Sequence, residues 1–321
     1  MSLPIYFAPL EGVTDSPFRS THSRHFTGVA KYFIPFISPT QNLVMTPRDL
    51  RAVLPQYNEG MHAVPQVLAR DPGYFLWAAQ QLHDMGYTEI NLNLGCPSGT
   101  VTAKGKGSGM LANRPMLEAF LNEVYARSPV AVSIKTRIGF ASPDEFEALL
   151  MLFSRYPVHE LIVHPRTRSQ FYKGEPYMPA YAAAHDACPH PLVYNGDLFT
   201  AQACRELAAA YPRTAALMLG RGLIANPALA QTLAGGPPLT LDALRSFHDD
   251  LFAAYQERYP RNVAIGRMIG IMNHLCCCFE NADKPNKAIR KSKQIAEYED
   301  AVSRLFSSCP FKADPYYISW Y

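Results

Sequence analysis

The chain has 321 residues, 48% of them hydrophobic, and a formal net charge of +3. This length suits a barrel of about 250 residues with an appended domain, and no apolar run approaches the ~20 residues of a membrane-spanning helix. The seven cysteines lack disulfide or zinc spacing and the first residues lack a leader pattern, so we expect a reduced, cytoplasmic protein that holds no metal and has no membrane segment.

The first strand is predicted over residues 5–10 and ends in Ala8, Pro9 and Leu10, whose small side chains let a flat molecule approach the backbone. Ser16 is the predicted cap of the helix that follows, with Pro17 at its first position. The second and third strands are predicted over residues 29–36 and 62–68, and Gln66 lies near the end of the third. A helix then begins after Asp71 and is stopped by Gly86.

Residues 89–95 alternate between apolar and polar side chains, which is typical of a strand with one polar face. That face ends in Asn93, and Cys96 follows where the strand opens into a glycine-rich loop. A thiol in this position can reach a substrate and then be covered by the loop. A buried structural cysteine is the alternative, and these residues alone leave both interpretations open.

Four more strands follow with the same pattern of polar residues at their ends. They are predicted over residues 130–139, 160–166, 191–198 and 215–219. A capping box at residues 142–145 starts the helix between the first two of these. The polar residues at or after their ends are Lys135 and Arg137; His164 and Arg166; Asn195, Gly196 and Asp197; and Gly220 and Arg221.

Eight strands alternating with helical segments predict a (β/α)8 TIM barrel. The strand ends recur about every 30 residues, except that the interval from Asn93 to Lys135 spans 42 and contains the glycine-rich loop. In a barrel the strand ends converge on one rim, so the polar residues should share one mouth. A doubly wound sheet is the competing fold, but it gives no reason for a polar cluster at every strand end.

The loops after the seventh and eighth strands are where barrels commonly bind phosphate through loop N–H groups. The residues therefore favour a flat cofactor that carries a phosphate. Flavin mononucleotide (FMN) is favoured over pyridoxal phosphate because amide side chains outnumber carboxylates at these strand ends. Lys135 would face its electron-rich ring, and Gln66 can pair with an imide edge.

Over roughly residues 4–235 the chain resembles the tRNA-dihydrouridine synthases of the bacterial type. The resemblance rests on Asn-Leu-Asn-Leu-Gly-Cys-Pro at 91–97, the most specific motif, and on the motifs at 8–15, 135–139, 164–167, 195–197 and 220–222. Leu10 replaces a common Met, Pro165 a usual Gly, and Gly99-Thr100 a basic pair. These departures touch the details of RNA contact rather than the chemistry.

The resemblance implies an FMN-dependent reduction of a specific uridine in tRNA to dihydrouridine, with NADPH or NADH as reductant. Cys96 would supply a proton as a thiol, so its pKa should not be strongly lowered. Asn93 and Arg137 would hold the uracil, and Arg166 the uracil or its phosphate. The expected FMN contacts are Ala8, Pro9, Leu10, Gln66, Lys135, His164, Asn195, Gly196, Asp197, Gly220 and Arg221.

A Gly-Gly-Pro-Pro stretch at 235–238 divides the expected barrel domain, residues 1–236, from a helical tRNA-binding domain, residues 237–321. Helices are predicted over 241–258, 262–280 and 287–306. Residues 284–293 hold five basic side chains and no acid, so Lys287, Arg290 and Lys291 are expected on tRNA phosphates. A solvated helix face is the alternative. The aromatic tail at 315–321 is expected to pack onto the helices.

Three other functions remain open. An FMN barrel can oxidise or reduce a free pyrimidine, as dihydroorotate-type dehydrogenases do, but a basic helical appendage is superfluous for a small substrate. An aldolase-type lyase would use Lys135 as a Schiff base; that needs a desolvated lysine, whereas Arg137 and the cofactor-like loops indicate otherwise. A catalytically silent RNA-binding protein is the third.

Overall fold

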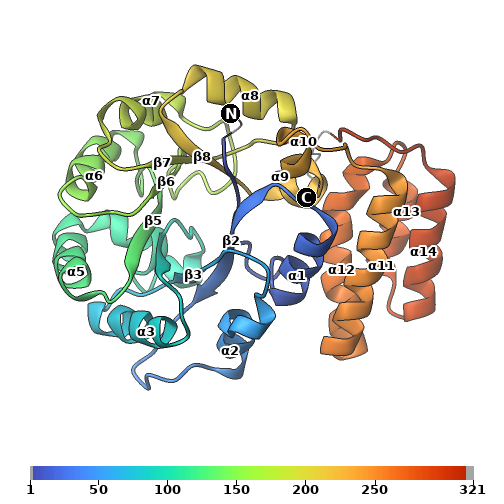
Figure 1. Ribbon diagram of the computed structural model, residues 1–321, viewed down its shortest axis with the longest axis horizontal. Helices are drawn as coiled ribbons and strands as arrows, with labels where there is room; N and C mark the ends of the chain where they lie inside the picture. Colours follow the sequence, from blue (N-terminus) through green and yellow to red (C-terminus); the bar gives the residue numbers. More distant parts are fainter. Residues whose placement is uncertain (1–2, 316–321) are drawn as a thin grey trace.

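The computed structural model describes residues 3–315 and shows eight parallel strands that close into a barrel in chain order, β1 to β8 (Figure 1). The predicted (β/α)8 fold is confirmed. The strands are shorter than most of the predicted runs because the residues at their carboxyl ends turn into the loops of the rim. They are β1 (Ile5–Phe7), β2 (Val29–Ile37), β3 (Ala63–Val67), β4 (Glu89–Leu94), β5 (Ala131–Arg137), β6 (Leu161–His164), β7 (Leu192–Asn195) and β8 (Thr214–Leu219).

Helices surround the barrel on its outer face (Figure 1). Ten are α-helical: α1 (Ser16–His25), α2 (Pro47–Val53), α3 (Pro72–Asp84), α4 (Gly99–Thr102), α5 (Arg114–Arg127), α6 (Phe146–Phe153), α7 (Met178–Ala187), α8 (Ala201–Ala210), α9 (Arg221–Ala225) and α10 (Leu229–Leu233). Short 3-10 helices lie at η1 (Pro55–Tyr57), η2 (Gly107–Ala112) and η3 (Pro143–Glu145). Within residues 3–315 no helix is long and apolar enough to cross a membrane.

Helix starts follow the local sequence. Asp71 caps α3 by accepting from Tyr74 N, and Ser142 with Glu145 forms the predicted capping box. The cap of α1 is Asp15 rather than Ser16, because the Asp15 carboxylate accepts from Phe18 N and Ser16 is already helical. That prediction was wrong by one residue.

Each strand separates two kinds of interior. Apolar side chains such as Ile90 and Leu92 face the surrounding helices and join the large outer core. Inside the barrel lies a smaller apolar cluster that includes Tyr6, Phe33 and Ile162. The polar residues of β3, β4 and β5 are buried as well, and β4 pairs with β5 so that Asn93 lies opposite Lys135.

The last four helices pack together beside α1 (Figure 1): α11 (Leu241–Arg258), α12 (Arg261–Leu275), α13 (Asp283–Lys291) and α14 (Ile295–Ser308). The prediction for α11 is confirmed. α12 ends earlier than predicted because buried Cys276–Cys278 form a 3-10 turn, η4. The helix predicted over 287–306 is two helices, because the Glu297 carboxylate accepts from Lys293 N and Gln294 N and so starts α14.

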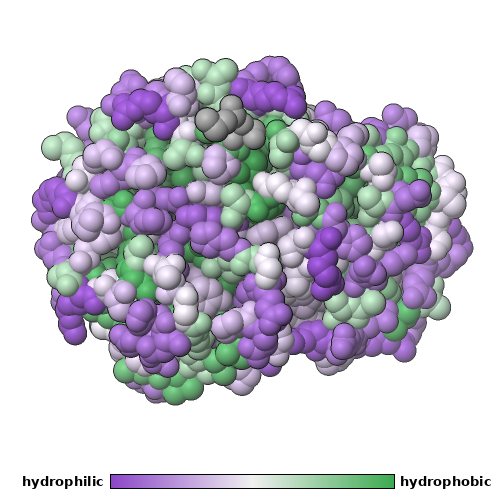
Figure 2. All heavy atoms as spheres, in the orientation of Figure 1, coloured by the Kyte–Doolittle hydropathy of each residue, from purple (hydrophilic) through white to green (hydrophobic). Residues whose placement is uncertain are grey.

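This helical unit is fixed to the barrel near the loop that follows β1. Phe18 of α1 packs edge-on against Phe247 of α11, with ring centroids 5.9 Å apart. The Asp15 carboxylate accepts hydrogen bonds from the hydroxyls of Tyr255 and Tyr259 and from Arg267, at 2.7–3.0 Å. Hydrophilic and hydrophobic residues are interspersed over the face shown in Figure 2. Residues 316–321, most of the aromatic tail, lie outside the described residues.

Candidate active site

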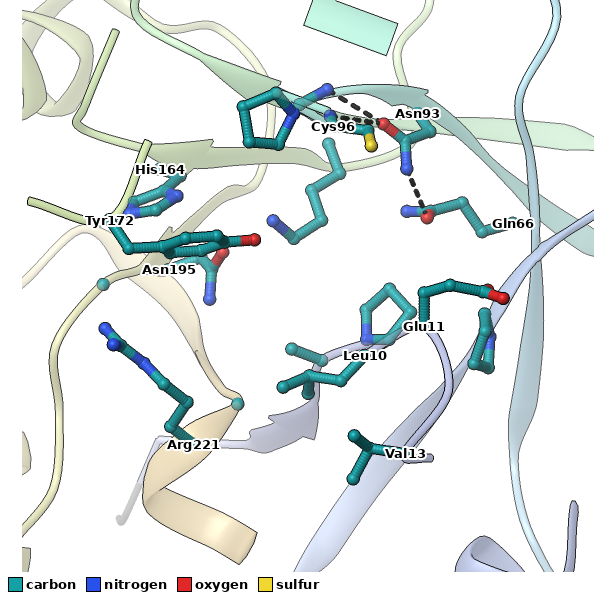
Figure 3. Close-up of a pocket in the computed structure, with 18 of the residues that line it drawn as sticks. Leu10, Glu11, Val13, Gln66, Asn93, Cys96, His164, Tyr172, Asn195 and Arg221 are labelled. Atoms are coloured by element: carbon teal, nitrogen blue, oxygen red, sulfur yellow. Dashed lines mark hydrogen bonds between the residues drawn. The ribbon is translucent and has the colours of Figure 1, made fainter. Parts of the chain in front are cut away.

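A cavity of about 550 Å³ opens at the carboxyl ends of the strands. Its volume lies within the ~300–1,000 Å³ typical of ligand sites. The barrel brings together fourteen of the residues singled out in the sequence, and ten of the residues that line the cavity are labelled in Figure 3. The fourteen are Ala8, Pro9, Leu10, Gln66, Asn93, Cys96, Lys135, Arg137, His164, Asn195, Gly196, Asp197, Gly220 and Arg221.

Two amide side chains on adjacent strands are locked together on one wall of this cavity. Asn93 Nδ2 donates to Gln66 Oε1 at 2.7 Å, and Asn93 Oδ1 accepts from the backbone N–H groups of Gly95 and Cys96 at 3.0 and 2.9 Å (Figure 3). The Asn93 amide therefore fixes where the chain turns after β4. It places Cys96 beside Gln66 rather than leaving the residue on an open loop.

Cys96 is held by its backbone on both sides. Its carbonyl accepts from Ser108 N at 3.2 Å and from Ser108 Oγ at 2.8 Å. Gly107 has a φ of +57°, and a Cβ there would lie 2.9 Å from the Cys96 carbonyl oxygen, so only glycine fits. The half-buried thiol lines the cavity, and burial raises its pKa against the opposing effects of a Ser98 backbone hydrogen bond and of Arg137. The thiol form is favoured, as expected.

Lys135 extends into the cavity from β5 and makes no hydrogen bond or ion pair with another residue in the described part of the chain. Desolvation and the nearby Arg137 charge lower its pKa to about 7. The sequence argument that this lysine is not desolvated was wrong, because the barrel walls and the Arg137 cation both disfavour its charged form. A low pKa alone thus does not separate a Schiff-base lysine from a cofactor contact.

Three backbone carbonyls hold the Arg137 guanidinium in place. Its Nε donates to Gly95 O at 2.8 Å, and its Nη1 donates to Thr167 O at 2.8 Å and Phe171 O at 2.6 Å. The guanidinium is only 1% exposed yet borders the cavity. It therefore connects the Cys96 turn with the loop after β6.

The loops after β6, β7 and β8 are joined through Asp197. Its carboxylate pairs with Arg166 Nη2 at 2.5 Å and with Arg221 Nη2 at 2.6 Å. Arg166 Nη1 lies 3.1 Å from His164 Nε2, and because a guanidinium only donates, this nitrogen accepts and the proton resides on Nδ1. Burial and the neighbouring cations hold the pKa of His164 well below its usual value, so the ring is neutral.

Arg166 differs from the other predicted site residues. It is 1% exposed, does not line the cavity, and donates to Gly174 O in addition to its bonds with Asp197 and His164. It supports the residues that do line the cavity. Lys287, Arg290 and Lys291 also lie away from the cavity, on or at the end of the exposed face of α13, and all three are exposed.

The loops after β7 and β8 approach each other more closely than a side chain at Gly222 would allow, and Gly196 also has no room for a side chain. A Cβ at Gly222 would lie 2.2 Å from Leu198 O, and one at Gly196 would lie 2.2 Å from the Tyr194 hydroxyl. The guanidinium groups of Arg137 and Arg221 line the cavity beside the carboxylates of Glu11 and Asp197, and Lys135, with a pKa of about 7, adds a positive charge only in part. The chemistry of the lining therefore fits a flat ligand with an anionic group near Arg221.

The sequence analysis missed several lining residues, above all Tyr172. The residue is 57% exposed, and the guanidinium carbons of Arg137 and Arg221 lie 5.3 and 5.5 Å from the centroid of its ring (Figure 3). The only feature of the sequence that could have identified Tyr172 is that it is an aromatic residue in the long connection after β6. His274 was missed because it belongs to α12 and reaches the cavity only through domain packing; burial lowers its pKa to about 4.

Comparison with known proteins gives consistent findings. The family model described as dihydrouridine synthase (Dus) matches residues 6–301. Similar curated proteins include tRNA-dihydrouridine synthase B of Pasteurella multocida, 28% identical over 71% of this chain and 68% of that protein. Another is tRNA-dihydrouridine(16) synthase of Pseudomonas putida, 30% identical over 83% of this chain and 86% of that protein.

Solved structures with a similar fold include a variant of NCR from Zymomonas mobilis, with a TM-score of 0.51 and 15% identity over 76% of this chain and 90% of that one. Morphinone reductase has a TM-score of 0.50 and 13% identity over 73% of this chain and 86% of that one. At these identities the likeness concerns the barrel fold.

Proposed function

The chain belongs to the dihydrouridine synthase family, and from this we propose that it is an FMN-dependent oxidoreductase that reduces a uridine of tRNA to 5,6-dihydrouridine. The observation that carries the proposal is the placement of Cys96. Its thiol faces a cavity with a phosphate-compatible end, and it is fixed there by Asn93, which also holds Gln66. A site for acid catalysis and a site for a flat cofactor thus share one wall.

FMN would lie across the mouth of the barrel. The backbone of Ala8–Pro9–Leu10 offers a flat surface, Gln66 offers amide groups to the polar ring edge, and Lys135 and His164 border the ring. The Asn195–Gly196–Asp197 and Gly220–Arg221 loops would hold the phosphate, with Arg221 as its cation. Arg166 would act by holding Asp197 and His164 in place.

Bound FMN, reduced by NADPH or NADH, would supply a hydride to C6 of the uracil. Reduction of the C5–C6 double bond also needs a proton at C5, which Cys96 Sγ–H would donate. Arg137 and Asn93 would orient the uracil against this thiol. Arg137 is suited to this because backbone carbonyls already fix its guanidinium, so little entropy is lost on binding.

Substrate capture divides between two regions. We propose that residues 1–236 form the catalytic unit and residues 237–321 the tRNA-binding unit, with Lys287, Arg290 and Lys291 on phosphates. The target uridine stacks within folded tRNA and must be turned out to enter the barrel. A tRNA substrate places the reaction in the cytoplasm, and the reaction itself calls for no metal ion.

We further propose uridine 16 as the target. The Pasteurella relative aligns with 71% of this chain, whereas the relative named for position 16 aligns with 83% of it, so the second likeness extends over more of the chain. In this proposal the helical unit, residues 237–321, would determine which way the tRNA enters. Mapping dihydrouridine in tRNA from a strain lacking this protein tests the assignment: loss at another position, with 16 intact, contradicts it.

The central experiment is to purify the protein and identify the released chromophore by chromatography, then to measure dihydrouridine formation with unmodified tRNA and NADPH or NADH. FMN and tRNA reduction support the proposal. FMN together with turnover of a free pyrimidine, and none of tRNA, favours a dihydroorotate-type dehydrogenase. A colourless folded protein whose Lys135 is trapped by borohydride with an aldehyde favours a lyase, and a colourless protein that only binds tRNA favours a silent RNA-binding role.

A further inference from the structure

Buried polar side chains form one connected path through the barrel interior, from its amino-terminal end to Cys96. Ser133 donates to Glu89 Oε1 at 2.8 Å and accepts from Asn91 Nδ2 at 3.0 Å. Asn91 Oδ1 accepts from Gln66 Nε2 at 2.7 Å, and Gln66 Oε1 accepts from Asn93 Nδ2 at 2.7 Å. The four side chains from Ser133 to Asn93 are each at most 7% exposed, so water does not replace these bonds.

Chemistry at the upper end of the path permits only one orientation of its amides. The N–H groups of Gly95 and Cys96 only donate, so Asn93 must present its oxygen to them and its NH2 to Gln66. Gln66 must then accept through Oε1 and donate through Nε2. Asn91 must in turn accept from Gln66 and donate to Ser133.

Chemistry at the lower end requires the same orientation. Lys31 only donates; its Nζ lies 2.7 Å from Glu89 Oε2 and 3.0 Å from Glu160 Oε2, and Tyr6 OH donates to Glu160 Oε1 at 2.7 Å. The ammonium keeps Glu89 an acceptor. The Ser133 hydroxyl hydrogen can go to Glu89 Oε1 at 2.8 Å or to Ile90 O at 3.4 Å, both acceptors, so Ser133 accepts from Asn91. Both ends thus impose one direction of donation on every member.

We infer that the Lys31–Glu89 ion pair and Ser133 are positioning residues: through Asn91 they hold in one direction the Gln66 amide, whose orientation Asn93 already sets. This inference rests on the proposed function in so far as FMN is the ligand that meets Gln66. Gln66 lines the cavity with its Nε2 oriented by Asn91, so it offers a donor of set direction to an acceptor on the ring edge. Without the fixed Asn91 bond, the Asn93 bond alone would still set the orientation of the Gln66 amide but would leave the direction of Nε2 free to vary.

Ser133→Ala is the test, because it removes one hydroxyl and leaves both charged groups and both cavity amides in place. Asn93 still holds Gln66 Oε1 in this variant, so the loosened Asn91 bond should weaken one neutral hydrogen bond from Gln66 to the cofactor and lower FMN affinity about 2- to 12-fold. In a Gln66→Ala background the same substitution should change FMN affinity less than about twofold, because the group it orients is gone. Equal effects in both backgrounds would overturn the inference.

Thr214→Val is the matched control. Thr214 Oγ1 makes a buried hydrogen bond 2.9 Å long with the Tyr181 hydroxyl, outside the path and on the outer side of the barrel. The midpoint temperature of thermal unfolding should fall by similar amounts in Thr214→Val and Ser133→Ala, whereas FMN affinity should fall only in Ser133→Ala. A loss of FMN affinity common to both variants would indicate general loosening and would contradict the positioning role.

A readout without cofactor separates this inference from the proposed function. In flavin-free protein, Ser133→Ala should shift the side-chain NH2 resonances of Asn91, Gln66 and Asn93 in heteronuclear NMR spectra. A shift confined to Asn91 would overturn the inference even if FMN binds as proposed. Shifts at all three support it even if the wild-type protein takes no FMN, a result that would defeat the cofactor assignment alone.

Discussion

Replacing Cys96 by Ala isolates the contribution of its thiol with little disturbance of the turn. The contacts that hold this residue, from Cys96 N to Asn93 Oδ1 and from Ser108 to the Cys96 carbonyl, involve backbone atoms that Ala retains. FMN content and reduction by NADPH should therefore stay normal. A positioned general acid is worth about 10²–10⁴-fold, so the rate of dihydrouridine formation should fall by that factor.

The pKa of Cys96 gives the pH dependence of the same prediction. A thiol whose pKa is raised above 9.0 is at least about 90% protonated at pH 8. Proton donation by the wild-type protein should therefore persist to pH 8 and decline above pH 9, as the thiol ionises. Cys96→Ala should show a low rate without this decline.

The assay is a single turnover. Enzyme reduced under anaerobic conditions is mixed with unmodified tRNA, and flavin reoxidation is followed by absorbance while dihydrouridine is quantified. Cys309→Ala, at a half-buried thiol outside the cavity, is the control. If Cys96→Ala reoxidises with tRNA within about threefold of wild type, the proton comes from another group and the assignment of Cys96 is refuted.

Three further predictions concern charge and packing. Neutralising the exposed cations of α13 by Lys287→Gln, Arg290→Gln and Lys291→Gln should weaken tRNA binding and leave FMN content unchanged. The slope of log affinity against log salt concentration should become shallower by about 1 for each lost phosphate contact. An unaltered slope would mean that the RNA binds elsewhere. Lys135 has a pKa of about 7 in the folded protein and 10.5 in the unfolded chain, so the unfolded chain binds more protons between these pH values. The free energy of unfolding of the apoprotein, measured by denaturant titration, should therefore rise by about 2 kcal/mol from pH 7 to pH 9. Lys135→Met should abolish this rise. Gly222→Ala should lower both stability and FMN content, because the added Cβ would lie 2.2 Å from Leu198 O. Gly266→Ala, whose Cβ would meet no atom within 4 Å, should not reduce FMN content. A normal FMN content in Gly222→Ala would show that the loops adapt.

Much of the fold follows from periodicity and local chemistry. The alternation in β4 and the recurrence of strand ends about every 30 residues can both be read directly along the chain. The sequence therefore predicted the barrel and the convergence of its polar strand ends. Caps at Asp71 and Ser142 are equally local. The errors in the last helices also have local causes, because capping by Glu297 competes with helix continuation, and sequence spacing alone does not show which one prevails.

Only the tertiary structure showed which of the predicted site residues border the cavity and which hold other residues in place. Arg137 and Arg166 look alike in sequence, each at or beyond a strand end, but Arg137 borders the cavity while Arg166 is enclosed by Asp197, Gly174 and His164. The low pKa of Lys135 depends on its burial in the barrel and on Arg137, and His274 reaches the cavity from α12 of the helical unit. Such properties arise from the summed placement of distant groups. Residue type and spacing therefore determined which chemistry is available, and burial and long-range packing determined which atoms face the ligand.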